Sequence, residues 1–195
     1  MRKLIVTILV LCGMVFAAGL NINATPQTTD TEELYWDADT EGNDIFNWKS
    51  GVWFVMPFDG TVITVRTDHS NVGYAEGYTI TLCPRDSGGM PDEASAYGSQ
   101  HYAGGASGPG WLDIDVSALD VELSENDEFY YVIQPDSSFE FWNDTTGSPD
   151  HNAWNQGSGW AASGLPPYHL RVIVEDNGGS RVELTSWGEV KVLNQ

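Results

Sequence analysis

Aromatic and short polar side chains both occur within residues 141–160, and this combination suits the binding of sugars. Flat indole rings pack on the C–H surfaces of a sugar ring, while carboxylate and amide groups hydrogen-bond its hydroxyls. The candidate ligand-binding residues are three tryptophans and three short polar residues: Trp142, Asp150, Asn152, Trp154, Asn155 and Trp160. The segment therefore predicts a sugar-binding loop.

Burial in the protein interior is the alternative for these tryptophans, because large β-sandwiches pack indoles at the ends of their sheets. Both interpretations stay open on sequence grounds. Exposure separates them, since an indole that stacks on a ligand cannot also be fully packed in the core. A sugar platform requires at least one of the three indoles to be partly exposed beside Asp150, Asn152 or Asn155.

A second candidate site is a run of carboxylates that begins like a calcium-binding loop. Alternate acidic positions followed by Gly42 match the first half of an EF-hand, where oxygen ligands face a hard cation. The match then ends, because the twelfth position is Trp48 where a bidentate carboxylate is required. A looser calcium site would use four carboxylates: Asp37, Asp39, Glu41 and Asp44. The alternative is a solvated turn, and calcium is the one cofactor that the sequence suggests.

Catalytic patterns are sparse in this sequence. The four histidines show no HExxH or other zinc spacing, and there is no Gly-x-Ser-x-Gly turn of a serine hydrolase. Cys83 has no nearby base in sequence, which favours a small packed residue over a nucleophile. We predict that the protein is not an enzyme. A glycosidase remains a distant third alternative, because paired carboxylates meet in space and leave no spacing to detect.

In the segments that must hold these residues, apolar and polar side chains alternate with a period of two residues. In residues 60–67, Ile63 and Val65 fall on one side of an extended chain. Similar alternation predicts strands over eight ranges: 34–37, 52–56, 60–67, 78–83, 111–116, 129–134, 139–142 and 168–175. Turn-forming residues separate them, and no stretch between the leader and residue 180 sustains a helical pattern. The sequence predicts an all-β protein, a single antiparallel β-sandwich of jelly-roll or Greek-key type.

The same alternation predicts which side chains face the core. Asp113 and Asp115 fall opposite Ile114 and are expected at the surface. The expected buried set is Leu34, Trp53, Ile63, Ile80, Leu82, Ile114, Tyr131, Val132, Leu170 and Val172.

The first 18 residues resemble a secretory leader in their organisation. Arg2 and Lys3 precede an apolar run over residues 4–16, which is shorter than the about 20 residues that span a bilayer. We expect a secreted protein, extracellular or in the cell envelope, without a membrane span. The predicted segments are a cleaved signal peptide (1–18), a flexible mature N-terminus (19–31), the sandwich domain (32–176), and a linker with a short C-terminal tail (177–195).

The chain is strongly acidic, with 28 Asp and Glu against 8 Lys and Arg and a net charge of −20. This charge repels nucleic acids and anionic lipid headgroups, so we expect neither as a partner. Removal of the leader takes Cys12 with it and leaves Cys83 as the single cysteine, so no internal disulfide forms. The folded state must therefore be stabilised by side-chain packing or by a bound metal ion.

Several motifs, in order, resemble an accessory β-sandwich of large secreted bacterial proteins. They are Phe54-x-x-Pro57-x-x-Gly60-Thr61-Val62, Tyr78-x-Ile80-x-Leu82 with a Gly-Gly-x-Pro turn at 88–91, Gly110-Trp111-x-x-Ile114-Asp115-Val116-Ser117, the alternation that starts at Phe129, and His169-Leu170-Arg171-Val172-Ile173-Val174. Such domains are similar to the carbohydrate-binding and convertase-P-domain type of jelly roll, and they accompany proteases, glycosidases and adhesins. The resemblance covers residues 34–175 and implies a binding or structural module.

The C-terminal residues resemble the Thr-x-Trp-Gly-x-Ile-Lys-x-Leu tail of other exported bacterial proteins. The matching run here is Thr185-Ser186-Trp187-Gly188-Glu189-Val190-Lys191-Val192-Leu193. Ser186 and Glu189 have the spacing of a capping box, so a short helix is expected from Trp187. Such a helix either docks on the domain or serves as a sorting or assembly tag.

Two functions from different classes follow from these observations. The first is a secreted, non-catalytic binding module that recognises an extracellular glycan or a cell-surface protein. The alternative is an extracellular or envelope structural or adhesion protein whose C-terminal tail directs sorting or assembly.

The calcium hypothesis predicts a change in thermal stability. If the carboxylates of residues 37–44 hold the ion in the folded state alone, calcium should raise the melting temperature and a chelator should lower it. Calorimetry of the mature protein with calcium and with EGTA measures both effects. An unchanged midpoint would leave these carboxylates without a metal role.

Overall fold

A computed structural model describes residues 30–36, 41–46, 48–69, 77–105, 110–136, 139–144, 151–163, 168–178, 181–184 and 190–193. The predicted leader lies outside these residues. Within them, no helix has the length and apolar character needed to cross a membrane.

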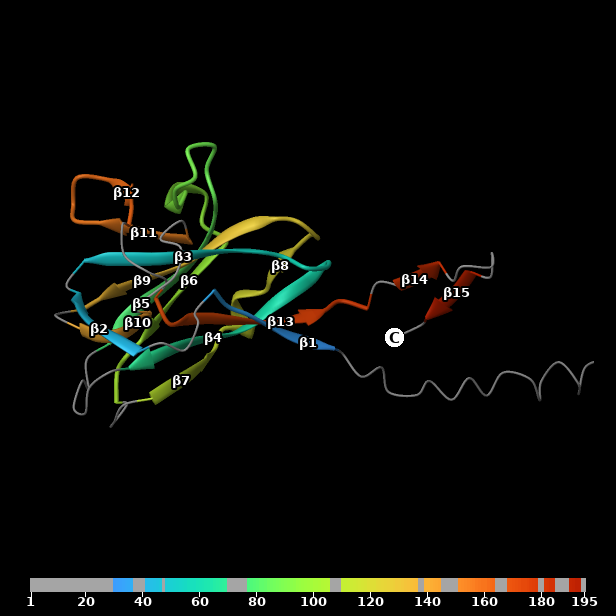
Figure 1. Ribbon diagram of the computed structural model, residues 1–195, viewed down its shortest axis with the longest axis horizontal. Coiled ribbons are helices and arrows are strands. Elements are labelled where there is room, and N and C mark those ends of the chain that lie inside the picture. Colours follow the sequence, from blue (N-terminus) through green and yellow to red (C-terminus); the bar gives the residue numbers. More distant parts are fainter. Residues whose placement is uncertain are drawn as a thin grey trace, which may run out of the picture.

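Two antiparallel sheets form the protein (Figure 1). The seven-stranded sheet contains β1 (Thr31–Leu34), β13 (Leu170–Asp176), β4 (Gly60–His69), β10 (Phe139–Asp144) and β2 (Glu41–Phe46), with β7 (Gly110–Asp115) and β8 (Val121–Leu123) also paired to β4. The six-stranded sheet has the order β12 (Trp160–Ala162), β11 (Asn152–Asn155), β3 (Lys49–Val55), β9 (Glu128–Pro135), β5 (Tyr78–Pro84) and β6 (Gly98–Tyr102). The chain crosses repeatedly between the sheets, and the predicted all-β sandwich is confirmed.

Helical structure in the described residues is limited to short 3-10 turns, among them η1 (Glu93–Ser95) and η2 (Ser117–Leu119). The remaining strands, β14 (Arg181–Leu184) and β15 (Val190–Leu193), pair with each other and join neither large sheet.

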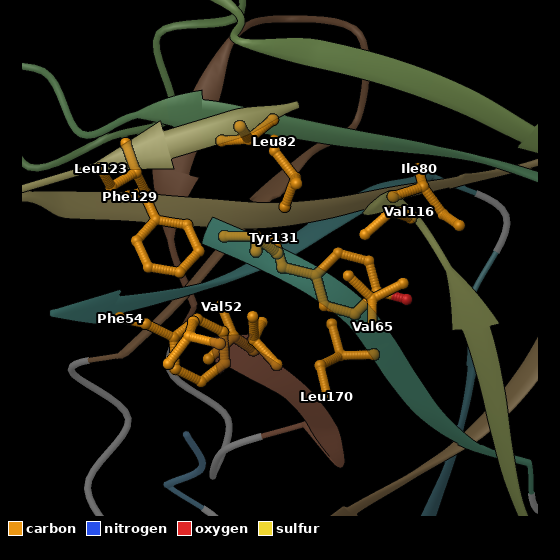
Figure 2. Packing of buried hydrophobic residues seen from close by; sticks show 14 of the residues in the cluster. Val52, Phe54, Val65, Ile80, Leu82, Val116, Leu123, Phe129, Tyr131 and Leu170 are labelled. Atoms are coloured by element: carbon orange, nitrogen blue, oxygen red, sulfur yellow. The ribbon is translucent and has the colours of Figure 1, made fainter. Parts of the chain in front are cut away.

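Alternate side chains of both sheets meet in one apolar core. Figure 2 shows Val52 and Tyr131 of the six-stranded sheet pointing into the same interior as Val65 and Leu170 of the other sheet. Seven of the residues expected to be buried are buried: Ile80, Leu82, Ile114, Tyr131, Leu170 and Val172 in this core, and Val132 in a separate cluster on the other face of β9.

A buried hydroxyl group joins the two sheets across this core. The Thr67 Oγ1 atom of β4 lies 2.7 Å from the Tyr131 hydroxyl oxygen of β9. The Tyr78 hydroxyl of β5 donates to the same Thr67 oxygen at 3.3 Å. All three residues are fully buried, so these bonds satisfy polar groups that would otherwise lose their hydrogen bonds to water.

Three expected core residues are only partly buried. Ile63 is the extra residue where the β4–β13 register shifts, because Thr64 pairs with Ile173 and Val62 pairs with Val174. This bulge reverses the alternation, so that Val62 and Val65 both face the core.

Trp53 and Leu34 are only partly buried for other reasons. Trp53 lies on the outer face of β3, where the Arg85 guanidinium is 4.2 Å from its ring centroid and the His151 ring stacks at 5.0 Å. Leu34 ends the edge strand β1 and packs only partly against the core.

Two further segments with an expected structure are described only in part. Glu41 and Asp44, expected in a calcium loop or a solvated turn over residues 37–44, lie in strand β2, which pairs with β10. In the expected C-terminal helix, residues 185–189 lie outside the described part of the chain, and Val190–Leu193 form strand β15. The β-branched Val182 pairs there with Val192, which suits an extended chain.

Replacing Thr67 with valine should destabilise the fold by about 1–3 kcal/mol, because the buried hydroxyls of Tyr131 and Tyr78 lose a partner. Urea unfolding of Thr67→Val, Tyr131→Phe and the double variant measures the coupling. Once Thr67 is valine, Tyr131→Phe should cost less than it does in the parent protein. Additive effects would show that the bond between the sheets contributes nothing.

The protein should lose stability in alkaline solution. Burial raises the pKa of the Cys83 thiol to about 12 and that of the Tyr130 hydroxyl to about 12, and it also raises the pKa values of Tyr78 and Tyr131. The unfolded chain ionises first, at about pH 8.5 for cysteine and about pH 10 for tyrosine, so the free energy of unfolding falls as the pH rises above these values.

Urea midpoints measured across this alkaline range test the effect. Cys83→Ala should remove the part of the stability loss that begins at the lowest pH. A midpoint that stays constant to about pH 11 would contradict it.

Candidate functional site

The outer face of the six-stranded sheet carries a second apolar cluster. Its buried members come from strands β5, β9 and β11: Cys83, Tyr130, Val132 and Ala153. Trp53, Met90 and Trp160 pack over them and are themselves partly buried. Residues on this face alternate with core residues of the same strands, as in Tyr130 and Tyr131.

The segment between β5 and β6 covers part of this face. The Arg85 Nη1 atom donates to Glu128 Oε2 at 2.6 Å, and the Tyr130 hydroxyl donates to the Gly89 carbonyl at 2.8 Å. Asp86 Oδ1 accepts from the backbone N–H groups of Gly88 and Met90, both at 2.8 Å. These bonds fix the start of the segment, which continues to Glu93 in η1.

Glu93 connects three elements of the site. Its Oε2 atom accepts from Lys49 Nζ at 2.5 Å, and its Oε1 atom accepts from Trp160 Nε1 at 3.0 Å. Lys49 begins β3 and Trp160 begins β12, so one carboxylate positions the ends of two strands. It also balances the positive charge of Lys49.

An open hollow of about 610 Å³ lies beside this connection. Its described lining residues are Trp48, Lys49, Gln134, Asn155, Gln156 and Gly157. An indole, three carboxamides and a paired ammonium therefore surround the space. Carboxamides both donate and accept hydrogen bonds, as sugar hydroxyls do.

Strand register brings the lining residues together. Lys49 of β3 pairs with Asn155 of β11. On its other side, β3 pairs with β9 so that Ser50 meets Ile133, and the next step places Lys49 beside Gln134.

The turn between β11 and β12 completes the hollow. Asn155 Oδ1 accepts from the backbone N–H of Gly157 at 2.8 Å and from that of Gly159 at 3.3 Å. Both glycines have positive φ values, 94° and 111°, which suit residues without a Cβ atom. Asn155 therefore shapes the turn that presents Gln156.

Trp48 supplies the aromatic wall of the hollow. Its ring meets that of Trp154 edge to face, with 5.4 Å between centroids and an interplanar angle of 70°. Trp48 also packs partly against the inner core, so its position is fixed from two sides.

The six predicted ligand-binding residues have different surroundings. Asn155 lines the hollow, Trp154 supports Trp48, and the half-buried Trp160 hydrogen-bonds to Glu93. Asn152 is only 2% exposed, and its Oδ1 atom accepts from the Tyr168 backbone N–H at 3.4 Å.

The other two predicted ligand-binding residues are not placed as side chains. Trp142 is described only as backbone in β10, where it pairs with Asn43. Asp150 lies outside the described residues.

The predicted calcium ligands are only partly described. Glu41 and Asp44 belong to β2, where they pair with Asp144 and Phe141, while Asp37 and Asp39 lie outside the described residues. Among the residues that the structure describes, no group of three or more His, Cys, Asp or Glu side chains is placed to hold a metal ion. The calcium site stays a prediction.

Sequence reasoning missed Trp48, Lys49, Gln134 and Gln156 as lining residues. Trp48 and Lys49 come four and three residues before the predicted strand 52–56, which was a weak signal. Gln134 offered no signal in the sequence, because only the register between β3 and β9 brings it beside Lys49.

No protein-family model matches the chain, and no curated protein matches it. Two solved structures of the clostridial cysteine protease Cwp84 are similar in fold. One shows a variant after propeptide cleavage, with a TM-score of 0.60 and 12% sequence identity over 75% of this chain and 40% of that chain. The other contains the cysteine protease and lectin-like domains of Cwp84, a surface layer associated protein of Clostridium difficile.

This second structure gives a TM-score of 0.58 and 12% identity over 75% of this chain and 36% of that chain. The chain thus spans well under half the length of these proteins. The likeness is one of fold, and it fits the accessory β-sandwich that the sequence motifs resemble.

Proposed function

We propose that this protein is a secreted, non-catalytic β-sandwich module that binds a glycan in the hollow beside Lys49. The observation that carries the proposal is the lining itself, in which Gln134, Asn155 and Gln156 surround a space walled by Trp48. An indole offers a flat apolar face, and carboxamides offer paired donors and acceptors.

The charge of the lining supports this assignment. The chain has 28 acidic residues, yet the described lining contains no carboxylate. Lys49, its one cation, is matched by Glu93. Polyhydroxylated ligands suit such a surface better than ions do.

The fold neighbours favour the same assignment. One of them combines a cysteine protease domain with a lectin-like domain in a surface layer associated protein. We infer that the sandwich here corresponds to the lectin-like part and not to the protease part. A cysteine protease needs an accessible thiolate, whereas Cys83 is fully buried and burial raises the pKa of its thiol to about 12, which leaves the thiol protonated. An extracellular or envelope location fits both the neighbours and the predicted leader.

A structural or adhesive role in the envelope is the alternative. The β14–β15 pair, which joins neither large sheet, is the observation that favours it. In that case the hollow would show no affinity for sugars.

Replacing Gln134 or Gln156 with alanine should weaken glycan binding about 2- to 10-fold each, because each substitution removes hydrogen bonds worth about 0.5–1.5 kcal/mol. Both side chains are exposed, so the melting temperature should hardly change. Isothermal titration with the best sugar from a glycan array measures the affinities.

Glu122→Ala is the matched control. Glu122 is an exposed residue of similar length on β8 of the other sheet, and its replacement should leave binding unchanged. Absence of any glycan binding by the parent protein, or equal losses in all three variants, would refute the proposal.

A further inference from the structure

We infer that the hollow is one end of a longer binding surface, which crosses five strands and takes an uncharged oligosaccharide of several units. This inference rests on the proposed function and adds the size and charge of the ligand. It comes from the register of the six-stranded sheet beyond the hollow.

A row of polar residues continues from the hollow across the outer face. Asn155 pairs with Lys49, and Lys49 lies beside Gln134. Gln134 of β9 pairs with Thr79 of β5, and Thr79 pairs with His101 of β6. Directly paired residues of antiparallel strands project from the same face, so these five residues form one line, the polar row.

The polar row is accessible and long. Gln134 and His101 are exposed, while Asn155, Lys49 and Thr79 are partly exposed. Four steps between neighbouring strands, each about 4.8 Å, give a length of about 19 Å. That length exceeds a single sugar ring, so the surface suits a chain of sugars that runs across the strands.

The next row toward the covered part of the face adds two hydroxyl groups. Thr81 pairs with Ser99, and their Oγ atoms lie 3.1 Å apart. The Ser99 hydroxyl donates to the Ile80 carbonyl at 2.8 Å, which fixes its position. These groups lie alongside Thr79 and His101, at the end of the polar row away from the hollow.

Charges along the row disfavour an anionic ligand. Lys49 Nζ lies 2.5 Å from a Glu93 oxygen, and His101 Nε2 lies 2.9 Å from an Asp136 oxygen. The ammonium of Lys49 is therefore already matched by a carboxylate, and His101 has a carboxylate beside it. An anionic sugar would approach both carboxylates without an unmatched cation to offset them, whereas an uncharged one avoids this cost.

Titration calorimetry with oligosaccharides of increasing length tests the inference on the mature protein. The probes are the cello-, xylo-, manno- and chito-oligosaccharide series from disaccharide to hexasaccharide, with oligogalacturonates of the same lengths as anionic counterparts. For the uncharged series that binds, the Kd of the hexasaccharide should be at least about tenfold lower than that of the disaccharide. The oligogalacturonates should bind more weakly at every length.

Variants at the far end of the row locate the effect. Thr79→Val keeps the shape of the side chain, and His101→Ala removes an exposed ring. Each should weaken hexasaccharide binding by about threefold or more, and by a larger factor than disaccharide binding, while Glu122→Ala changes neither.

The outcomes separate the two claims. If no series binds, the proposed function is wrong. If binding is independent of chain length, or if the far-end variants affect both lengths equally, the hollow binds sugar but the longer surface is refuted. Tighter binding of the oligogalacturonates would overturn the assignment of an uncharged ligand.

Discussion

The register between β3, β9 and β5 is the constraint on which both faces of the six-stranded sheet depend. Side chains alternate between faces along each strand, so one register places Phe54, Tyr131 and Leu82 in the core and Lys49 and Gln134 outside. A slip of one residue would exchange the two sets. The apolar core thus enforces the arrangement of the polar row, although the row itself contributes little to stability.

Glu93 has a comparable role among the covering segments. Its two bonds join η1 to the first residues of β3 and β12, and the side chains of Lys49 and Glu93 are 29% and 27% exposed. Ion pairs at such positions add little to the free energy of unfolding. Their value here is orientation, because the pair fixes Lys49 and neutralises it beside the hollow.

The sequence predicted the sheets better than the site. Alternation in residues 78–83 is regular, and the apolar run in residues 129–133 suits a strand that is buried on both faces; these segments lie in the strands β5 and β9. Alternation failed at Ile63 because a bulge leaves no mark in composition. The acidic and glycine residues within 37–44 disfavour strands and suggest a calcium loop or a solvated turn, but pairing with β10 overrides this preference at Glu41 and Asp44. Asn155 was identified from its type, but its neighbours Lys49 and Gln134 are distant in sequence and meet only through pairing.

Backbone amide chemical shifts, followed during titration with the tightest-binding hexasaccharide, test whether an uncharged oligosaccharide binds the outer face of the six-stranded sheet, because each strand of the face reports separately. We expect the shifted amides to cluster around Lys49, Gln134, Thr79 and Asn155. Shifts confined to the seven-stranded sheet would contradict this expectation.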